Sequence, residues 1–324
     1  MKQDRKKRSR VSKLTDTNTP FARLLLVPSL AGVLVFFIIP FMIVIWYSFL
    51  DNPINKDFVF LRNYQVLFKN NAFITAAKNT LILSAVAVPL AVVLSLGLAS
   101  LLDSKIPGKS MFRTFFLCPM MVPVASVVLI WQVVFDYNGT LNAVLGEWFQ
   151  AQPVDWMKSS KCLMVVVLLF LWKNLGYNMI LFLAALNNIP RDCLEVAELE
   201  GAGPLYRLLH IKLRYLSPTI LFVTILSLIN SFKLFREVYL LTGDYPFEDL
   251  YLLQHFMNNT FKSLDYQKLS AAAMIMSLVM VVIIGALFII DNKFGEDVEE
   301  TSYLYKQYYI KFLHLFVFWG CKVR

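Results

Sequence analysis

Long apolar runs alternate with charged connections along this chain of 324 residues. A helix needs roughly 20 apolar residues to cross the core of a bilayer, and six segments reach that length. Within each segment the apolar residues are continuous instead of being spaced along one face. The segments are 24–50, 78–103, 113–136, 162–190, a run that starts near Tyr215, and 268–291. The pattern predicts an all-α, polytopic membrane protein with six transmembrane helices.

Several prolines lie within or at the ends of these predicted spans. Membrane helices tolerate kinks, because neighbouring helices and ordered water can satisfy the freed backbone groups. We therefore expect the spans to persist, with bends at Pro40 and Pro89. The prolines concerned are Pro28, Pro40, Pro89, Pro119 and Pro123.

The composition agrees with a membrane protein. Hydrophobic residues make up 58% of the chain and charged residues only 16%, whereas soluble proteins carry roughly 25% charged residues. On a soluble protein the net charge of +9 would suggest a nucleic-acid partner. Here the basic residues gather at the N-terminus and in particular connections, which is typical of membrane orientation. We therefore expect membrane lipid around the protein and no nucleic-acid partner.

The distribution of Lys and Arg predicts how the chain is oriented. Three basic stretches are expected in the cytoplasm, namely 1–21, 103–113 and 191–214. Three connections poorer in net positive charge are expected outside, namely 51–77, 136–160 and 242–265. The positive-inside rule then places both termini in the cytoplasm.

We divide the chain into three parts. Residues 1–21 form a basic cytoplasmic N-terminus, 22–291 the six-span domain and 292–324 a cytoplasmic tail of unknown role. The first span is full length and ends in Trp46-Tyr47, so we interpret it as a retained span and not as a signal peptide. The predicted location is the cell (inner or plasma) membrane. An aromatic stretch at 308–319 is too short for a span; it is compatible with a surface helix or with a non-native extension.

The segment 195–213 is too long for a turn and too charged for the lipid core. Glu195 and Glu198 lie three residues apart, so a helix would group them on one face. The sequence Gly201-Ala202-Gly203-Pro204 then ends that helix, and a second short amphipathic stretch leads into the fifth span. From the residues alone, a solvated connection and a docking element for a soluble partner are equally supported.

A polar patch interrupts the fourth and fifth spans. Lys173 lies near the middle of the fourth span, where a charge is costly unless it faces a polar cavity or a partner. Aromatic and amide side chains around it are of the kind that binds sugars. Two roles stay open for Lys173: lining a solute path, or pairing with a group of a partner subunit. The fourth-span candidates are Trp172, Lys173, Asn174, Tyr177 and Asn178, and those on the fifth, where a structural role is favoured, are Asn230, Ser231 and Phe232.

Metal sites and catalytic sites are not indicated. The four cysteines form no CxxC pair, and their spacing does not suggest zinc. The histidines, His210, His255 and His314, are far apart in the sequence. No Gly-x-x-x-x-Gly-Lys-Ser/Thr phosphate loop occurs, so we do not expect this chain to bind ATP. We predict no metal, no cofactor on this chain and no enzymatic activity.

The 195–213 segment resembles the cytoplasmic signature loop of ABC importer permeases. That loop reads Glu-Ala-Ala, then Gly after a short gap, then Ile-x-Leu-Pro. Val196 and Arg214 depart from the pattern, standing where it has Ala and Pro. By this resemblance the ATPase-coupling residues are Glu195, Ala197, Glu198, Gly201, Ala202, Ile211 and Leu213.

The resemblance extends, in order, over about residues 21–291. It indicates the carbohydrate-type permeases, the class that includes maltose and glycerol-3-phosphate importers. The matching stretches are Leu61-Arg62-Asn63-Tyr64 with Phe68; Asn79-Thr80; Phe112-Arg113 with Pro119 and Trp131; Phe182-Leu183-Ala184-Ala185-Leu186 with Ile189-Pro190; and Phe232, Phe235, Tyr239 and Leu241-Thr242-Gly243.

What the resemblance implies is one subunit of an ATP-driven importer for a sugar or related polar solute. A second, homologous permease would complete the translocation path, and a solute-binding protein would deliver cargo outside. A cytoplasmic ATPase dimer would carry ATP and Mg, and the 195–213 segment would dock on it as a coupling helix between spans 4 and 5. The alternative is a secondary transporter, which usually shows inverted repeats and broken helices.

Overall fold

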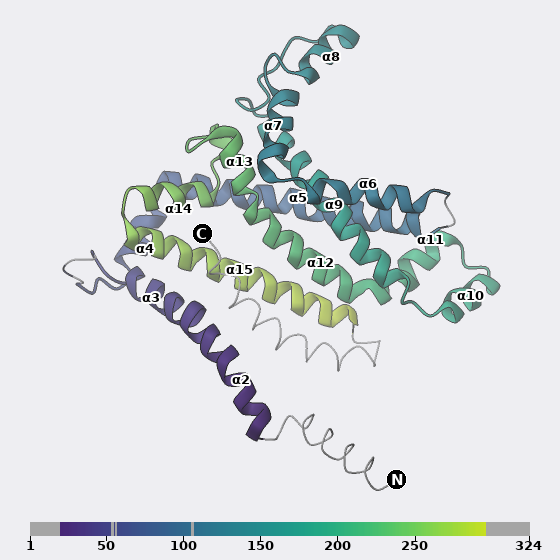
Figure 1. The fold of residues 1–324 in the computed structure, drawn as a ribbon, viewed down its shortest axis with the longest axis horizontal. Helices are drawn as coiled ribbons and strands as arrows, with labels where there is room; N and C mark the ends of the chain where they lie inside the picture. Colours follow the sequence, from purple (N-terminus) through teal and green to yellow (C-terminus); the bar gives the residue numbers. More distant parts are fainter. Residues whose placement is uncertain (1–19, 53–54, 56, 105–106, 296–324) are drawn as a thin grey trace. The chain divides into compact units, whose positions relative to one another are not determined.

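The computed structural model describes residues 20–52, 55, 57–104 and 107–295. Regular structure within these residues is helical (Figure 1), apart from one isolated β-bridge between Leu50 and Phe58. The chain forms two compact units. One contains Tyr64–Asp265 with the second half of the last helix, and the other contains the first span with the beginning of that helix. Most of the predicted N-terminal part and nearly all of the predicted tail lie outside the described residues.

The helices follow one another with short connections. Their bounds are α2 (Pro20–Val33), η1 (Leu34–Ile38), α3 (Ile39–Ser48), α4 (Arg62–Phe68), α5 (Asn71–Asp103), α6 (Lys109–Met121), α7 (Val124–Phe135), α8 (Thr140–Phe149), α9 (Cys162–Leu186), α10 (Arg191–Leu199), α11 (Pro204–Tyr206), η2 (Arg207–Lys212), α12 (Leu213–Lys233), α13 (Phe235–Thr242), η3 (Glu248–Leu250), α14 (Leu253–Lys262) and α15 (Tyr266–Gly295).

The first span continues from α2 through η1 into α3. Pro40 lies at the beginning of α3 and has no N–H to donate, so regular helical bonding is lost around it. The backbone before it widens into a π turn, in which the N–H of Ile39 donates to the carbonyl of Leu34. At the end of this span, the side-chain amide of Asn63 donates to the carbonyls of Ser48 and Leu50 at 2.9 and 2.8 Å.

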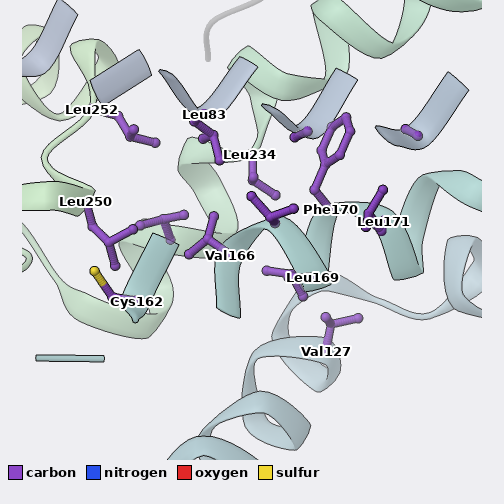
Figure 2. Packing of buried hydrophobic residues seen from close by; sticks show 14 residues of the cluster. Leu83, Val127, Cys162, Val166, Leu169, Phe170, Leu171, Leu234, Leu250 and Leu252 are labelled. Atoms are coloured by element: carbon purple, nitrogen blue, oxygen red, sulfur yellow. The ribbon is translucent and has the colours of Figure 1, made fainter. Parts of the chain in front are cut away.

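The larger unit is organised around α5, α9 and α12, which pack against one another. Figure 2 shows a buried cluster to which α5 contributes Leu83 and α9 contributes Val166 and Phe170. A second buried cluster continues along α9 at Phe182 and includes Leu216 of α12. Just over half of the most apolar stretch of α9 is buried by its neighbours, the largest share among the six candidate spans. It is the central helix of this unit.

The two ends of this packing carry different polar contacts. Lys212, just before α12, bonds to Asp103 at one end of α5. Near the other end, the amide of Asn79 donates to the carbonyl of Tyr251, and Thr80 Oγ1 accepts the N–H of Leu253. The helix rises by 1.5 Å per residue, so these ends are roughly 36 Å apart, close to the thickness of a bilayer. Connections predicted on opposite sides of the membrane thus lie at opposite ends of α5.

The third span differs from the prediction of one helix over 113–136. Helix α6 ends at Met121, and α7 begins after Val122 and Pro123, whose ψ angles of 130° and 141° are not helical. The ring of a proline pushes the preceding residue out of the helical region, so Pro123 interrupts this span instead of bending it. Apolar residues continue across the break, which hid it from the hydrophobic pattern.

The number of spans is nevertheless confirmed. Six helical runs among the described residues are long and apolar enough to cross a membrane. The third of them is Val124–Phe149, which contains α7 and α8. The fifth begins earlier than Tyr215, because α11, η2 and α12 are continuous from Pro204. The second amphipathic stretch of the 195–213 segment is therefore the first part of this span.

Gly176 sets the distance between α6 and α9. A Cβ atom at this position would lie 1.9 Å from the carbonyl oxygen of Phe116 in α6. Small residues are common where membrane helices approach closely, because association there depends on backbone proximity and van der Waals packing. No larger residue fits Gly176 unless α6 moves.

We predict that Gly176→Ala lowers the thermal stability of the protein. The added methyl group meets main-chain atoms that cannot rotate away, and overpacking of this kind costs about 1–3 kcal/mol or more. The melting temperature in detergent, followed by tryptophan fluorescence, measures the effect. Gly97→Ala on α5 is the matched control, since nothing lies within 4 Å of its added Cβ. Equal melting temperatures for the two variants would contradict the close approach.

Candidate functional site

Helix α10 begins right after Pro190 and contains the first residues of the 195–213 segment, up to Leu199. Asp192 in its first turn favours helix formation, because the helix N-terminus carries a partial positive charge. Its end is a Schellman turn, in which the N–H groups of Gly201 and Ala202 donate to the carbonyls of Glu198 and Ala197 at 3.0 and 2.9 Å. Gly201 has φ +83°, a conformation that residues with a side chain rarely adopt.

The 195–213 segment exposes an apolar surface. Leu199 is 88% exposed and Leu205 is 67% exposed, and no residue of α10 or α11 is buried. We call this surface the docking patch; it consists of Val196, Leu199, Leu205, Tyr206 and Leu209. Exposed apolar residues that form a contiguous patch mark interaction surfaces. Val196 and Leu199 lie outside the candidate membrane spans, whereas Leu205, Tyr206 and Leu209 lie at the start of the run Pro204–Thr242.

The predicted coupling residues lie along this segment in different settings. Glu195, Glu198 and Gly201 are exposed, whereas Ala197 and Ala202 are half-buried. Ile211 and Leu213 are half-buried in the helix that leads into the fifth span. Sequence reasoning missed the docking patch, although the apolar residues within a charged segment were its signal.

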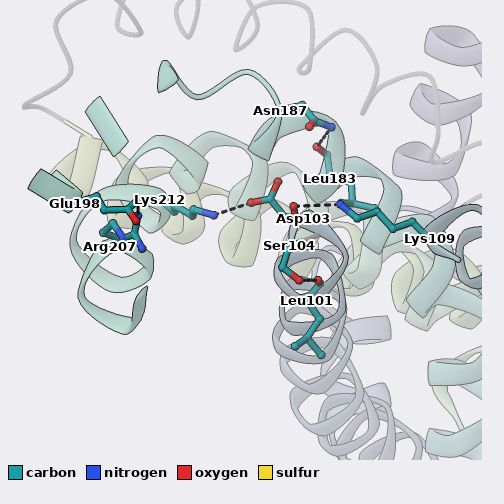
Figure 3. A network of polar contacts seen from close by, with 9 residues as sticks. All are labelled: Leu101, Asp103, Ser104, Lys109, Leu183, Asn187, Glu198, Arg207 and Lys212. Carbon is teal, nitrogen blue, oxygen red and sulfur yellow. Dashed lines mark hydrogen bonds and ion pairs between the residues drawn. The ribbon is translucent and has the colours of Figure 1, made fainter. Parts of the chain in front are cut away.

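A polar network joins this segment to the rest of the larger unit (Figure 3). Lys212 donates to the carboxylate of Asp103 at 2.6 Å, and Arg207 donates to that of Glu198 at 2.6 Å. Lys109 donates to the main-chain carbonyl of Asp103 at 3.3 Å. These contacts hold the start of α6, the end of α5 and the start of the fifth span together.

Lys173 pairs within the chain, with Glu237 of α13. The Glu237 carboxylate is almost completely buried, and the Lys173 side chain is mostly covered. The sequence interpretation placed a pairing group for Lys173 on a partner subunit, and this chain itself supplies one. The sequence signal was Glu237, a carboxylate at the far end of the fifth span. The pattern of spans alone did not show that Glu237 lies at the same depth in the membrane as Lys173.

The other members of the polar patch form a series of bonds between helices. Asn230 of α12 donates to Asn174 of α9 at 2.9 Å, and Asn178 donates to Ser227 of α12 at 2.9 Å. Ser231 shares a hydrogen bond of 2.9 Å with Ser84 of α5. The amides and hydroxyls on α9 and α12 thus fix the contact between helices. Asn178, Ser231 and Phe232 are buried.

Five members of the patch keep part of their surface uncovered. Trp172 also packs on Trp131 of α7, with 5.1 Å between ring centroids. The half-buried members are Trp172, Lys173, Asn174, Tyr177 and Asn230.

His255 lies at the other end of the larger unit, in α14. It is buried, its ring stands edge-on to Phe235 at 4.7 Å, and Tyr251 and Tyr239 lie beside it. Its Nδ1 accepts the N–H of Leu252 at 3.3 Å and caps α14. Burial lowers the pKa of His255 to about 4, and the nearby Asp244 opposes this shift only in part. The imidazole is neutral in the folded protein.

Asp244 itself is bound by Lys262 at 2.5 Å. The hydrogen bond from Lys262 lowers the pKa of Asp244 and raises the pKa of Lys262. Among the described residues, no three His, Cys, Asp or Glu side chains gather as a metal site requires.

Residues 88–296 match the family described as binding-protein-dependent transport system inner membrane components, and this chain belongs to that family. It is therefore a multi-pass transport subunit of the inner membrane and not an enzyme. The family supports the importer prediction and not the alternative of a secondary transporter.

Two curated relatives illustrate the similarity. The chain is 32% identical over 270 residues to the sn-glycerol-3-phosphate transport system permease protein UgpA of Yersinia enterocolitica, covering 80% of this chain and 89% of the relative. It is 29% identical over 292 residues to the trehalose/maltose transport system permease protein MalF of Thermococcus litoralis, covering 88% and 98%.

Solved structures show the same fold. One is a chain of a bacterial ABC transporter involved in the import of the acidic polysaccharide alginate, with a TM-score of 0.74, 21% identity, and 84% of this chain and 95% of that chain covered. A second is the bacterial alginate transporter in complex with an alginate pentasaccharide-bound periplasmic protein, with a TM-score of 0.74, 19% identity and 85% and 95% covered.

We predict that removing one partner of the Lys173–Glu237 pair destabilises the protein and that removing both restores most of the loss. A buried charge left alone typically costs roughly 3–5 kcal/mol, whereas a neutral pair of similar size does not. Melting temperatures of Lys173→Met, Glu237→Gln and the double variant test this. A double variant no more stable than the single variants would show that the two groups do not act as a pair.

We predict that α14 opens more easily at acidic pH. The folded segment keeps His255 neutral down to about pH 4, whereas the opened segment takes up a proton near the ordinary pKa of 6.5. Stability is therefore full above pH 6.5 and falls as the pH drops from 6.5 to 4, by up to roughly 3 kcal/mol. Hydrogen exchange of α14, corrected for the intrinsic rate, measures this. In His255→Asn the opening of α14 is expected to depend less on pH. An unchanged pH dependence would mean that another group causes it.

Proposed function

We propose that this protein forms half of the translocation path of an ATP-driven importer and docks its ATPase through the 195–213 segment. The observation that carries the proposal is the docking patch on α10, α11 and η2, which no other part of the described chain covers. It lies at the end of the α5–α9–α12 bundle where basic residues gather, so the positive-inside rule supports a cytoplasmic position for it and for both termini.

The proposal requires three partners, because this chain supplies only half of the path and no ATPase. A second, homologous permease completes the path, a cytoplasmic ATPase dimer binds ATP and Mg, and an extracytoplasmic solute-binding protein delivers the cargo. The family description, which names binding-protein-dependent transport, supports the last of these. So does the alginate importer of the same fold, which was solved with a periplasmic protein bound.

The cargo we propose is a sugar or related polar solute. The two relatives named above transport trehalose/maltose and sn-glycerol-3-phosphate by their descriptions. The half-buried members of the polar patch offer aromatic faces and amide groups to such a solute. The positive charge of Lys173 is already neutralised by Glu237. Binding of maltose, trehalose and sn-glycerol 3-phosphate to the cognate receptor would identify the cargo class.

We predict that Gly201→Val abolishes uptake while the protein still inserts into the membrane. A β-branched residue at φ +83° is strained, so the Schellman turn that orients α10 against α11 is lost. Uptake of the receptor's sugar and the amount of membrane-inserted protein are measured together. Gly203→Val is the matched control two residues away, because Gly203 has an ordinary φ of −66° and an open surrounding. Normal transport by Gly201→Val would overturn the coupling assignment.

A further inference from the structure

Two ion pairs attach the opposite ends of η2 to different helices (Figure 3). At its beginning, Arg207 binds Glu198 of α10. At its end, Lys212 binds Asp103 of α5. The short segment η2 therefore connects the docking patch with the end of α5, although Asp103 and Lys212 are 109 residues apart in sequence.

The backbone of η2 is a π helix, in which the N–H of Leu213 donates to the carbonyl of Leu208. Such segments are rare, short and frequent at functional sites. A π turn can exchange its bonds for those of an α-helix, and this exchange rotates the residues on its two sides relative to each other. A change between the two bonding patterns would rotate Lys212 relative to Arg207, whereas the ion pairs fix where each side chain attaches.

The two pairs differ in their surroundings. Glu198 is 67% exposed, so water and salt screen its pair with Arg207, which is worth at most about 1 kcal/mol. The Asp103 and Lys212 side chains are only 26% and 21% exposed and are screened less. Lys109 also holds the main chain of Asp103. The Lys212–Asp103 pair is the firmer attachment of the two.

Helix α5 leads from this attachment to the polar patch. Its C-terminal residue is Asp103, and its Ser84 bonds to Ser231 in the patch. A displacement that enters α5 at Asp103 therefore reaches the residues around the proposed solute path through one helix, which contains Pro89 between Ser84 and Asp103.

We propose that Lys212 and Asp103 are positioning residues which make α5 follow the movement of the docking patch, with η2 as the connection. The proposal rests on the function proposed above, because the movement it transmits is that of an ATPase docked on α10. Without the pair, the ATPase still docks and hydrolyses ATP, but α5 no longer moves with it.

The test measures transport and ATP hydrolysis together. The complete importer is reconstituted in liposomes, and radiolabelled maltose, trehalose and sn-glycerol 3-phosphate serve as probes. We expect Lys212→Met and Asp103→Asn each to lower the solute transported per ATP hydrolysed at least fivefold, with hydrolysis within twofold of the wild type. The charge exchange Asp103→Lys with Lys212→Asp is expected to recover at least half of the wild-type ratio.

A matched control and the following outcomes decide whether Lys212 and Asp103 are positioning residues. Lys262→Met breaks the ion pair with Asp244 at the other end of the unit and is expected to keep the wild-type ratio. If uptake and hydrolysis fall in parallel in Lys212→Met and Asp103→Asn, or if both variants keep the ratio, the positioning role of the two residues is overturned. If the charge exchange recovers nothing, the ion pair is overturned as its basis. If the wild type binds no ATPase and accumulates none of the probes, the proposed function itself fails. The positioning role of Lys212 and Asp103 then fails with it.

Discussion

Polar groups within the membrane-spanning part of a protein must find their partners inside the protein, because lipid offers none. In this chain most polar side chains of α9 meet that requirement, although the Oδ1 of Asn178 has no hydrogen-bond partner among the described residues. Lys173 is paired with Glu237, and the amides of Asn174 and Asn178 meet Asn230 and Ser227. These contacts fix the rotation of α9 relative to α12 and α13, and the apolar clusters pack around that arrangement. The same polar residues thus set the packing and leave the half-buried polar surface that we propose for a solute.

The connections at the ends of the helices follow a different rule, because water competes for every polar group there. At one end, Asn79 and Thr80 hold the segment from η3 to α14, and His255 is buried as a neutral ring. At the other end, ion pairs attach η2 to α5 and α10, while the docking patch stays uncovered. Both ends expose apolar side chains, Tyr245 and Leu264 at the first and Leu199 and Leu205 at the second. The docking patch at the second end supports the docking of an ATPase that we propose.

The hydrophobic pattern predicted the class of fold and the number of spans well, because bilayer thickness dictates the length of each apolar run. It predicted span interiors poorly. The hydrophobic pattern did not reveal the interruption at Pro123, because the residues on both sides of it are as apolar as those of a continuous membrane helix. The apolar pattern gives no role to Glu237 at the far end of the fifth span, because that role depends on Lys173, a residue 64 positions away.

The sequence by itself determined the all-helical class, the six spans, and the family resemblance of the 195–213 segment, because these depend on local composition and spacing. Only the tertiary structure decided which polar groups pair and which apolar residues of that segment remain uncovered. Such pairs form between helices that are far apart along the chain. The local sequence does not show how deep each side chain lies in the membrane or how its helix is rotated. The contact of Lys212 with Asp103, and of Lys173 with Glu237, exists only because packing brings distant helices to the same level.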